Sequence, residues 1–429
     1  MAVGAAVASP ADQARRHNSW LTRLESPLAP YYLILGAMIA LVVIGLVMVL
    51  SSSSVESLRV TNMHSSYSYF IKQAMFAGLG IPLAWLASRL PVRFWQAASW
   101  PLLAISAGLL LLVLFVGHSV NGNQNWIAIG GVTVQPSEAA KLAFLVWAAT
   151  VLARKEQLLL TLSHVLVPVV PVAGALLALV LAGRDLGTAM IMMVIVFGVL
   201  FLAGAPLRVF GATGASAVLL VGVLVVTSPN RMGRITNWLG MGTADNSGLN
   251  WQPLHGSYAL ATGGWWGVGL GASKETWFWL PEAHNDFIFA IIGEELGLPG
   301  TLAVLSLFAL LGIGMLRLIA ISEDLFVRVV TGGVLLWVVG QAIVNIGAVL
   351  GMLPVIGVPL PLVSSGGSAL VMTLIALGLV LGFARRVPGA PEALTARSGA
   401  VRRSLAVLPR RAGAAATRHR GAPGRGAGR

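Results

Sequence analysis

The sequence predicts an all-α polytopic integral membrane protein of about ten transmembrane helices, with a large extracytoplasmic loop between helices 7 and 8. Three observations support this fold class. Hydrophobic residues make up 57% of the chain and charged residues only 10%, and the mean hydropathy is +0.84. Apolar runs also recur at the roughly 20 residues that a helix needs to cross about 30 Å of hydrocarbon.

Ten segments are long enough, or nearly so, to span the bilayer. They are 31–51, 70–90, 97–117, 136–153, 163–182, 187–204, 208–228, 286–319, 327–350 and 362–384. The connections between the fourth and seventh segments are short, so the number of spans depends most on how this region is divided. We therefore divide the chain into a cytoplasmic segment 1–30, a ten-helix domain 31–386 with the extracytoplasmic loop 229–285, and a disordered basic cytoplasmic tail 387–429.

Basic residues favour this topology because Lys and Arg accumulate on the cytoplasmic side of short loops. The amino-terminal segment and the predicted inside turns contain Arg15, Arg16, Arg23, Arg89, Arg93, Arg154, Lys155, Arg208, Arg317 and Arg328. The predicted outside loops 120–135 and 351–361 contain no Lys or Arg, although Arg59 and Arg184 also lie outside in this topology. We expect an even number of spans in the cell membrane with both termini in the cytoplasm.

The net charge of +13 does not require a nucleic-acid partner, because much of it lies in the tail from Arg385. Arg alternates there with Ala, Gly and Pro without apolar periodicity, which is typical of disorder. Such a tail favours anionic lipid or an acidic cytoplasmic partner, unless it only sets topology. The absence of Cys excludes disulfides and thiolate metal or redox sites. The polar start predicts no cleaved signal peptide.

Asp286 is the leading candidate for a reactive group. It follows Glu282 and His284 and opens an apolar span that also contains Glu294 and Glu295. A bare carboxylate inside a span costs about 3 kcal/mol on insertion scales, so these residues need a reason. Asp286 faces the outside in this topology, where it serves either as a helix N-cap or as a catalytic carboxylate, and the first role does not exclude the second.

Other charged residues predict a buried ion cluster and a cationic site. Glu138 and Lys141 are three residues apart and share a helix face, while Asp185 opens another helix. We expect Lys141 and Asp185 to pair across the bundle in a structural cluster, with direct catalysis as the alternative, because buried ionisable groups are usually paired. Arg231 and Arg234 either face a phosphate-bearing substrate or are ordinary solvated arginines.

The long loop 229–285 combines tryptophans with glycines. Its aromatic residues are Trp238, Trp251, Trp265, Trp266, Trp277 and Trp279, and its glycines include Gly263, Gly264, Gly267, Gly269 and Gly271. This mixture indicates a packed loop at the membrane interface, where an aromatic belt explains most of the tryptophans. A glycine-rich phosphate cradle is the alternative.

The order of motifs resembles the FtsW/RodA type of the SEDS (shape, elongation, division and sporulation) family. The landmarks are Asn121-Gly122, Trp126-Ile127, Gln135-Pro136-Ser137-Glu138 with Lys141, Asp185-Leu186-Gly187-Thr188, Arg231 and Arg234, Gly263-Gly264 with Gly269 and Gly271, 280–297, Gln341 with Asn345, and Pro354, Gly357, Leu360-Pro361, Ser364 and Gly366-Gly367-Ser368. Each motif alone is weak, but their joint order across ten spans is specific.

This resemblance implies an inverting peptidoglycan glycosyltransferase that polymerises lipid II through β-1,4 bonds and releases undecaprenyl pyrophosphate on the outer face. Asp286 matches the family's catalytic aspartate, which would take the proton from the acceptor 4-hydroxyl, an effect typically worth about 10² to 10⁴ in rate. The expected substrate-binding residues are Arg231, Arg234, Lys274, Trp126, Glu282 and His284. Arginine, Lys274, or a divalent ion such as Mg²⁺ or Mn²⁺ would stabilise the departing pyrophosphate.

Four departures from the family pattern concern the cations and the long loop. Asn125 replaces a basic residue, Ser365 a Tyr, His255-Gly256 a Gln-Ser pair and Thr276 a Lys, although Lys274 is near. The flanks of Asp286 are intact, so the departures leave open which cation holds the pyrophosphate.

The alternatives to a division-type polymerase are a lipid II flippase that uses the charges of the bundle, an elongation-type polymerase and a recruiting scaffold. The phrase AHNDFIFAIIGEELGL, the long tail and the absence of Cys favour the division type, of an actinobacterial-like form. The resemblance also implies a class B penicillin-binding transpeptidase and other divisome membrane proteins as partners, at the division septum.

Overall fold

The computed structural model describes residues 26–60, 65–120, 123–130, 132–158, 162–241, 248, 250–277 and 279–390. The predicted amino-terminal segment up to residue 25, the Asn121-Gly122 motif and the tail beyond Ala390 lie outside the described residues. Residues Pro30–Phe383 form one compact unit, and the described residues on either side of it belong to a second. Everything below concerns the unit Pro30–Phe383.

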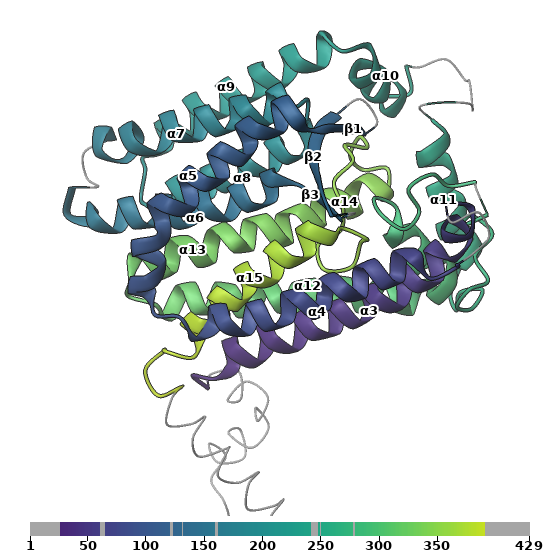
Figure 1. Cartoon of the computed structure of the whole chain (residues 1–429), viewed down its shortest axis with the longest axis horizontal. Helices are drawn as coiled ribbons and strands as arrows, with labels where there is room; N and C mark the ends of the chain where they lie inside the picture. Colours follow the sequence, from purple (N-terminus) through teal and green to yellow (C-terminus); the bar gives the residue numbers. More distant parts are fainter. Residues whose placement is uncertain are drawn as a thin grey trace, which may run out of the picture. The chain divides into compact units, whose positions relative to one another are not determined.

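The elements follow one another along the chain as drawn in Figure 1. They are α3 (Ala29–Val60), α4 (Ser68–Arg89), α5 (Val92–Val116), β1 (His118–Val120), β2 (Asn123–Ile129), β3 (Val132–Val134), α6 (Pro136–Arg154), η1 (Glu156–Leu158), α7 (Leu162–Ala182), α8 (Leu186–Leu202), α9 (Leu207–Val226), α10 (Pro229–Trp238), α11 (Trp251–Gly263), α12 (Ile288–Ile321), α13 (Leu325–Leu335), η2 (Leu336–Gly340), α14 (Gln341–Val349) and α15 (Gly367–Ala384).

The predicted membrane-spanning segments are helical, with shifted ends. Among the described residues, nine helices are long and apolar enough to span a membrane, and α8 is a shorter apolar helix of 17 residues. At about 1.5 Å per residue, α8 measures about 25 Å, a little less than the hydrocarbon thickness. The all-α, multi-pass membrane fold is confirmed, and the count of ten depends on α8.

A hydrogen bond at one end of the bundle bears on that count. Arg184 precedes α8 and Arg231 follows α9, and Arg231 Nη2 donates to Arg184 O at 3.0 Å. The chain therefore leaves this end along α8 and returns to it along α9, as expected if both helices cross. Gln124 N in β2 donates to Gly183 O at 3.0 Å, so the loop between α5 and α6 lies at the same end.

That loop contains a small sheet that the sequence did not predict. β2 pairs with β1 and with β3, both antiparallel, in the order β1-β2-β3. Backbone groups at a membrane edge need partners, and a hairpin supplies them within the loop. The sheet is a local addition to a helical fold.

The centre of the bundle is α6, of which 83% of the spanning window is buried. Its small and aromatic residues allow neighbouring helices to approach from several sides, and Phe144 and Trp147 are almost fully buried. Pro136 at the first turn suits this start, because its fixed φ fits a helix and its missing N–H would have no partner there. α6 therefore positions its polar residues inside the bundle.

α12 is interrupted where it meets the long loop. Gly297 has φ 65° and ψ −158° within the 34-residue helix, and Pro299 follows two residues later. Glycine allows this backbone, and proline lacks the N–H that would continue the ladder. The amino-terminal part of α12 thereby forms a separate short helix that begins next to Asp286.

The last two spans differ from the single helices predicted at 327–350 and 362–384. The first divides into α13, the π-helical turn η2 and α14, and the second begins only at Gly367. Leu362 has φ 66°, and Ser364 Oγ accepts from Leu360 N at 2.8 Å, so the chain turns before α15 can start. The connecting loop 350–366 is consequently longer than the 351–361 predicted.

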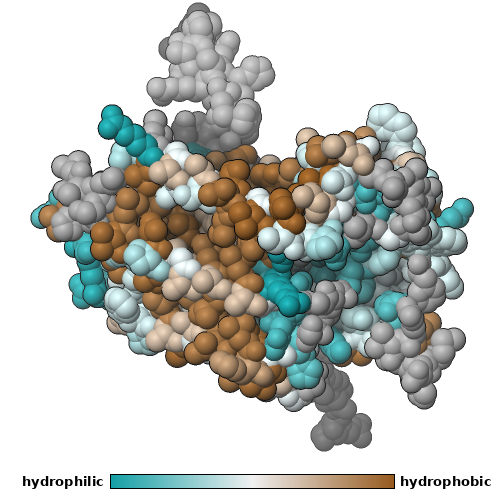
Figure 2. Space-filling model, turned by 90° about the horizontal axis from the view of Figure 1, so that it is seen from above, coloured by the Kyte–Doolittle hydropathy of each residue, from teal (hydrophilic) through white to brown (hydrophobic). Residues whose placement is uncertain are grey.

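The surface agrees with a membrane-embedded bundle. Figure 2 shows a broad area of hydrophobic side chains, with hydrophilic residues on either side of it. Large apolar side chains are exposed on the outside of the bundle, including Phe115 at 78% and Val218 at 74%. Such a continuous apolar surface is unfavourable in water and suits contact with lipid.

Candidate functional site

Asp286 lies in a tight turn immediately before α12. Asn285 N and Phe287 N both donate to Glu282 O, at 3.0 and 3.3 Å, and Glu282 has φ 58°. The N-cap of α12 is Phe287, and α12 has no side-chain capping bond. The alternative of Asp286 as an N-cap is therefore wrong, and its carboxyl group is left available for chemistry.

The Asp286 carboxyl group lies in a narrow crevice of about 10 Å³ beside the loop 355–358. Burial and the negative charge of Glu282 raise the pKa of Asp286, and the positive charge of Arg234 lowers it, with a net value of about 7. A carboxyl group with such a pKa is partly ionised near neutral pH and binds a proton readily. These are the properties required of a general base.

Gly357 forms the wall of the crevice. A Cβ atom built on it would lie 3.5 Å from Asp286 Oδ2, which is ordinary van der Waals contact, so space alone would allow a side chain. Its φ of 75° is what favours glycine, because L side chains rarely adopt that backbone. The turn brings main chain against the carboxylate.

A larger cavity of about 360 Å³ adjoins the crevice, and Val355 lines both. Arg234, Trp251, Gln252 and Pro281 line the rest together with Gly248. Arg234 comes from α10 and its Nη1 donates to Val355 O at 3.2 Å. The site thus combines a cation, an aromatic face and an amide beside the Asp286 crevice, and its volume is within the range of small-molecule sites, about 300–1,000 Å³.

Two polar side chains attach the Asp286 turn to the rest of the bundle. Asn345 Nδ2 donates to Asp286 O at 2.8 Å and to Val358 O at 2.7 Å. Ser364 Oγ donates to Asn285 O at 2.7 Å. Gln73 Nε2, from α4, donates to Ser364 O at 3.0 Å. Asn345 and Ser364 therefore fix the turn, and Gln73 holds Ser364 in place.

Glu282 and His284, both predicted to bind substrate, shape this turn. Glu282 supplies the carbonyl around which the chain reverses, and its Oε2 accepts from Asn285 Nδ2 at 3.4 Å. The His284 ring lies 4.5 Å from the Tyr69 ring, and His284 O accepts from Ser365 N at 3.0 Å. Burial lowers the pKa of His284, against the negative charges of Glu282 and Glu56, which favours a neutral ring in a packing role.

The other predicted substrate-binding residues are spread over the same end of the bundle. Arg231 is bound to the carbonyls of Leu224 and Arg184, at 3.3 and 3.0 Å. Lys274 is exposed, and its hydrogen bonds among the described residues are those of its main chain, whose N–H donates to Glu294 Oε1 and whose carbonyl accepts from Trp277 N. Trp126 is partly buried in β2. Of the predicted cations, Arg234 is the one with a recorded link to the Asp286 crevice.

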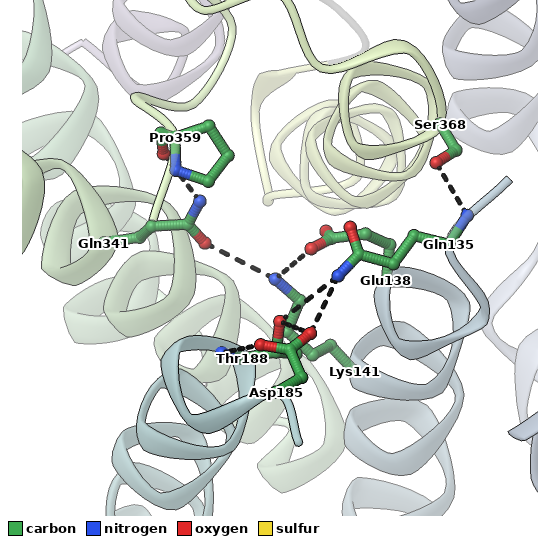
Figure 3. A network of polar contacts seen from close by, with 8 residues as sticks. All are labelled: Gln135, Glu138, Lys141, Asp185, Thr188, Gln341, Pro359 and Ser368. Carbon is green, nitrogen blue, oxygen red and sulfur yellow. Dashed lines mark hydrogen bonds and ion pairs between the residues drawn. The ribbon is translucent and has the colours of Figure 1, made fainter. Parts of the chain in front are cut away.

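The predicted ion cluster separates into two networks, shown in Figure 3. Lys141 Nζ pairs with Glu138 Oε1 at 2.8 Å and donates a hydrogen bond to Gln341 Oε1 at 3.4 Å. It also lies 4.7 Å from the centroid of the Trp337 ring. Glu138 and Lys141, which the sequence places on one helix face, therefore form an ion pair. Both side chains are almost fully buried.

The expected pairing of Lys141 with Asp185 is wrong. Asp185 is the N-cap of α8, accepting from Thr188 N at 2.9 Å and Thr188 Oγ1 at 2.7 Å. It also accepts from Gln135 Nε2 at 2.9 Å. These bonds satisfy the carboxylate locally, because a side chain at a helix start is held against the exposed N–H groups of its own first turn.

Glu294 and Glu295 attach the glycine-rich segment to α12. Glu294 accepts from Ser273 Oγ at 2.5 Å and from Lys274 N at 2.9 Å. Glu295 accepts from Ser51 Oγ at 2.6 Å, and Ser51 Oγ in turn accepts from Gly271 N at 3.0 Å. The costly buried carboxylates are therefore explained by hydrogen bonding. The phosphate-cradle alternative gains no support, because the backbone N–H groups of Gly267, Gly269 and Gly271 already donate to protein acceptors.

The described residues do not form a complete coordination site for a divalent ion. Among the described residues, no group of three or more His, Asp or Glu side chains converges. Mg²⁺ commonly binds through one or two carboxylates and substrate phosphates while keeping several waters. Such an ion would take most of its ligands from substrate and water rather than from the described residues.

Asn345, Gln341 and Ser364 are motif landmarks to which the sequence assigns no role, and the sequence gives no indication that Gln73 belongs to the site. Their hydrogen bonds join segments far apart in the chain, so spacing alone offered no signal. Trp251 and Gln252 were likewise not identified as cavity residues. The tryptophan content of the loop pointed towards a membrane belt instead.

Comparison with known proteins identifies the family. The model of the cell cycle protein family of FtsW, RodA and SpoVE matches residues 31–387. The chain belongs to this family. It is 39% identical over 383 residues to the probable peptidoglycan glycosyltransferase FtsW of Mycobacterium tuberculosis, covering 89% of this chain and 72% of that protein. It is 36% identical to the protein of the same description from Trichlorobacter lovleyi, over 85% and 96% of the two chains.

Solved structures of this family share the fold. One chain, from work titled "Structural coordination of polymerization and crosslinking by a peptidoglycan synthase complex", matches with a TM-score of 0.68 and 29% identity over 83% of this chain and 98% of that chain. The rod shape determining protein RodA of Thermus thermophilus matches with a TM-score of 0.60 and 28% identity, over 83% and 97%. The family assignment made from the motifs is confirmed.

Proposed function

We propose that this protein is an inverting peptidoglycan glycosyltransferase that polymerises lipid II into β-1,4-linked glycan strands and releases undecaprenyl pyrophosphate during septal cell-wall synthesis. The observation that supports this most directly is the Asp286 carboxyl group, with a pKa of about 7, next to a cavity lined by Arg234 and Trp251. The names of the curated relatives agree with this activity.

The chemistry assigned to Asp286 is general base catalysis. Its carboxylate takes the proton of the acceptor 4-hydroxyl as the oxygen attacks the anomeric carbon of the donor. The α-linked pyrophosphate leaves from the opposite face, which gives the β-glycoside by inversion without a covalent intermediate. Proton transfer of this kind is typically worth about 10² to 10⁴ in rate.

Arg234 is the residue we assign to the departing pyrophosphate. Its guanidinium group lines the cavity and lowers the pKa of Asp286, so its charge is felt at the reacting end of the site. Charge stabilised on the leaving group lowers the barrier directly. A divalent ion such as Mg²⁺ or Mn²⁺ bound with the substrate would supply additional positive charge to the departing pyrophosphate.

The remaining proposals concern cellular context. We place the site on the outer face of the cell membrane, both termini in the cytoplasm, and the protein at the division septum. The expected partner is a class B penicillin-binding transpeptidase, with other divisome membrane proteins nearby. The arginine-rich tail would contact anionic lipid or an acidic partner. We expect the purified chain alone to polymerise poorly.

The test is a lipid II polymerisation assay in liposomes containing the transpeptidase partner with its crosslinking activity blocked. Wild type should give a ladder of glycan strands on a gel, Asp286→Ala and Asp286→Asn should give none, and the control Glu156→Gln, an exposed carboxylate in η1, should match wild type. A ladder retained by the Asp286 variants would remove the general-base role. No ladder from wild type, with lipid II crossing the bilayer, would instead indicate a flippase.

A further inference from the structure

Two amide side chains one turn apart on α14 hold the loop that forms the Asp286 crevice. Gln341 Nε2 donates to Pro359 O at 2.8 Å, and Asn345 Nδ2 donates to Val358 O at 2.7 Å and to Asp286 O at 2.8 Å. Both side chains are 3% exposed. One helix face therefore fixes the crevice wall and the main chain of Asp286 together.

Gln341 also connects this face to the buried ion pair. Its Oε1 accepts from Lys141 Nζ at 3.4 Å, and Lys141 pairs with Glu138 at 2.8 Å. Figure 3 shows Gln341 between Lys141 and Pro359, with its two amide atoms facing opposite partners. Glu138 and Lys141 lie on α6, the most buried helix of the bundle. A continuous set of polar contacts thus joins the rigid core to the crevice wall.

The π-helical turn η2, Leu336–Gly340, precedes Gln341 directly. Such turns insert an extra residue into a helix and are frequent at functional sites. Here the turn carries Trp337 against Lys141 and is followed by the Gln341–Asn345 face. The extra residue rotates the helix that follows, and this sets the direction in which the Gln341 and Asn345 side chains point towards the loop.

Asn345 has one further polar atom. Its Oδ1 is buried and has no hydrogen-bond partner among the described residues, and Asn345 lines the same crevice as Asp286. Buried acceptors usually have a partner, so one that lacks it calls for an explanation. A substrate hydroxyl other than the one whose proton Asp286 takes would offer the matching donor.

We propose that Asn345 and Gln341 are positioning residues: Asn345 holds the Asp286 main chain and the crevice wall in the reactive arrangement, and Gln341 ties that wall to the Glu138–Lys141 pair. This inference rests on the proposed glycosyltransferase function for its kinetic consequence. The physical link itself is a property of the folded chain and has a readout that requires no activity.

The kinetic test compares Asn345→Ala, Asn345→Asp and Gln341→Glu with the control Gln157→Ala, an exposed amide in η1. Asn345→Ala should lower kcat by about 10²-fold, because small misplacements of a reacting group have effects of that size, with KM within about threefold of wild type. Gln341→Glu retains an acceptor for Lys141 but loses the donor to Pro359 O, so it should fold and still lower kcat.

The pH dependence separates positioning from general damage. The charged groups that act on Asp286 are Glu282, from its own turn, and Arg234, from α10; the loop 354–358 carries no charge. Asn345→Asp adds a carboxylate and should move the acid limb of kcat to higher pH. Asn345→Ala admits water and should move it to lower pH. Limb shifts in the same direction for both variants would overturn the proposal.

Hydrogen exchange measured by mass spectrometry on the full-length protein supplies the independent readout. Asn345→Ala and Gln341→Glu should accelerate exchange in peptides covering 351–366, and Asn345→Ala also in 282–287, while Gln157→Ala leaves both unchanged. Unchanged exchange in the Asn345 and Gln341 variants would overturn the inference. An inactive wild type with accelerated exchange in the variants would refute the glycosyltransferase function and leave the positioning role supported.

Discussion

At the scale of single residues, the site depends on how the surroundings of one carboxyl group change its affinity for protons. Burial and Glu282 raise the pKa of Asp286, and Arg234 lowers it, with a result of about 7. The strained backbone of Glu282, with φ 58°, is the turn that brings the two carboxylates near one another. Backbone strain of this kind persists only where surrounding contacts enforce it, commonly at functional sites.

The pH dependence of polymerisation should report this balance. Because the base must be ionised, activity should rise with pH through an apparent pKa near 7. Glu282→Gln removes a negative charge without changing the side-chain size, so the acid limb should move to lower pH. The measurement is the initial rate of lipid II consumption between pH 5 and 9. A limb that stays in place would show that Glu282 does not act on Asp286.

Asp286→Asn should also change stability, with a sign set by the same pKa. The folded-state pKa of Asp286 is raised above its unfolded value, so wild type loses stability as pH rises from about 4 to about 7, and Asn does not. At pH 8 the variant should be more stable by about 1–2 kcal/mol after solvent screening, and near pH 4 the two should be equal. Thermal melting in detergent at both pH values checks this, and a less stable variant at pH 8 would contradict it.

At the scale of elements, the buried charged side chains have ion-pair or hydrogen-bond partners within their own helix or in a neighbouring segment. Glu138 and Lys141 pair on α6, and Asp185 caps α8. Glu294 and Glu295 hold the glycine-rich segment, where Gly267, with φ 76°, packs against the backbone of Glu295. These contacts give each buried charge a structural role and weaken the flippase alternative, which needs charges free to move.

A double-mutant cycle should measure the α6 pair. Lys141→Ala leaves the Glu138 charge buried and uncompensated, a change typically costing about 3–5 kcal/mol. Adding Glu138→Gln should recover part of that loss, whereas adding Asp185→Asn should not. Thermal midpoints of the detergent-solubilised variants give the coupling. Stronger coupling of Lys141 to Asp185 than to Glu138 would contradict the observed pairing.

At the scale of the whole molecule, the reactive end is built from loops far apart in the chain. Gln124 meets Gly183, Arg231 meets Arg184, Arg234 meets Val355 and Asn345 meets Asp286. All these contacts lie at one end of the helical bundle, which is the arrangement expected if the long loop and Asp286 share the outer face.

Cysteine labelling should test the topology cleanly, because the chain contains no Cys. Ser257→Cys, in α11, should react with a membrane-impermeant maleimide in intact cells. Gln157→Cys, in the turn between α6 and α7, should react only after permeabilisation. Both positions are exposed. Labelling of Gln157→Cys but not Ser257→Cys from outside would show that the orientation is inverted. Labelling of both from outside would show that an even number of spans separates them, so that α8 does not cross the membrane.

The sequence by itself determined the membrane class, the approximate positions of the helices, the family and the choice of Asp286 as the candidate base, because hydropathy and motif order are properties of the linear chain. The tertiary structure decided which groups act together. It separated Asp185 from Lys141, assigned Glu294 and Glu295 to packing, and placed Asn345 and Gln341 beneath the Asp286 crevice. Hydrogen bonds are short and directional, so partners tens to hundreds of residues apart become recognisable only when the helices are packed.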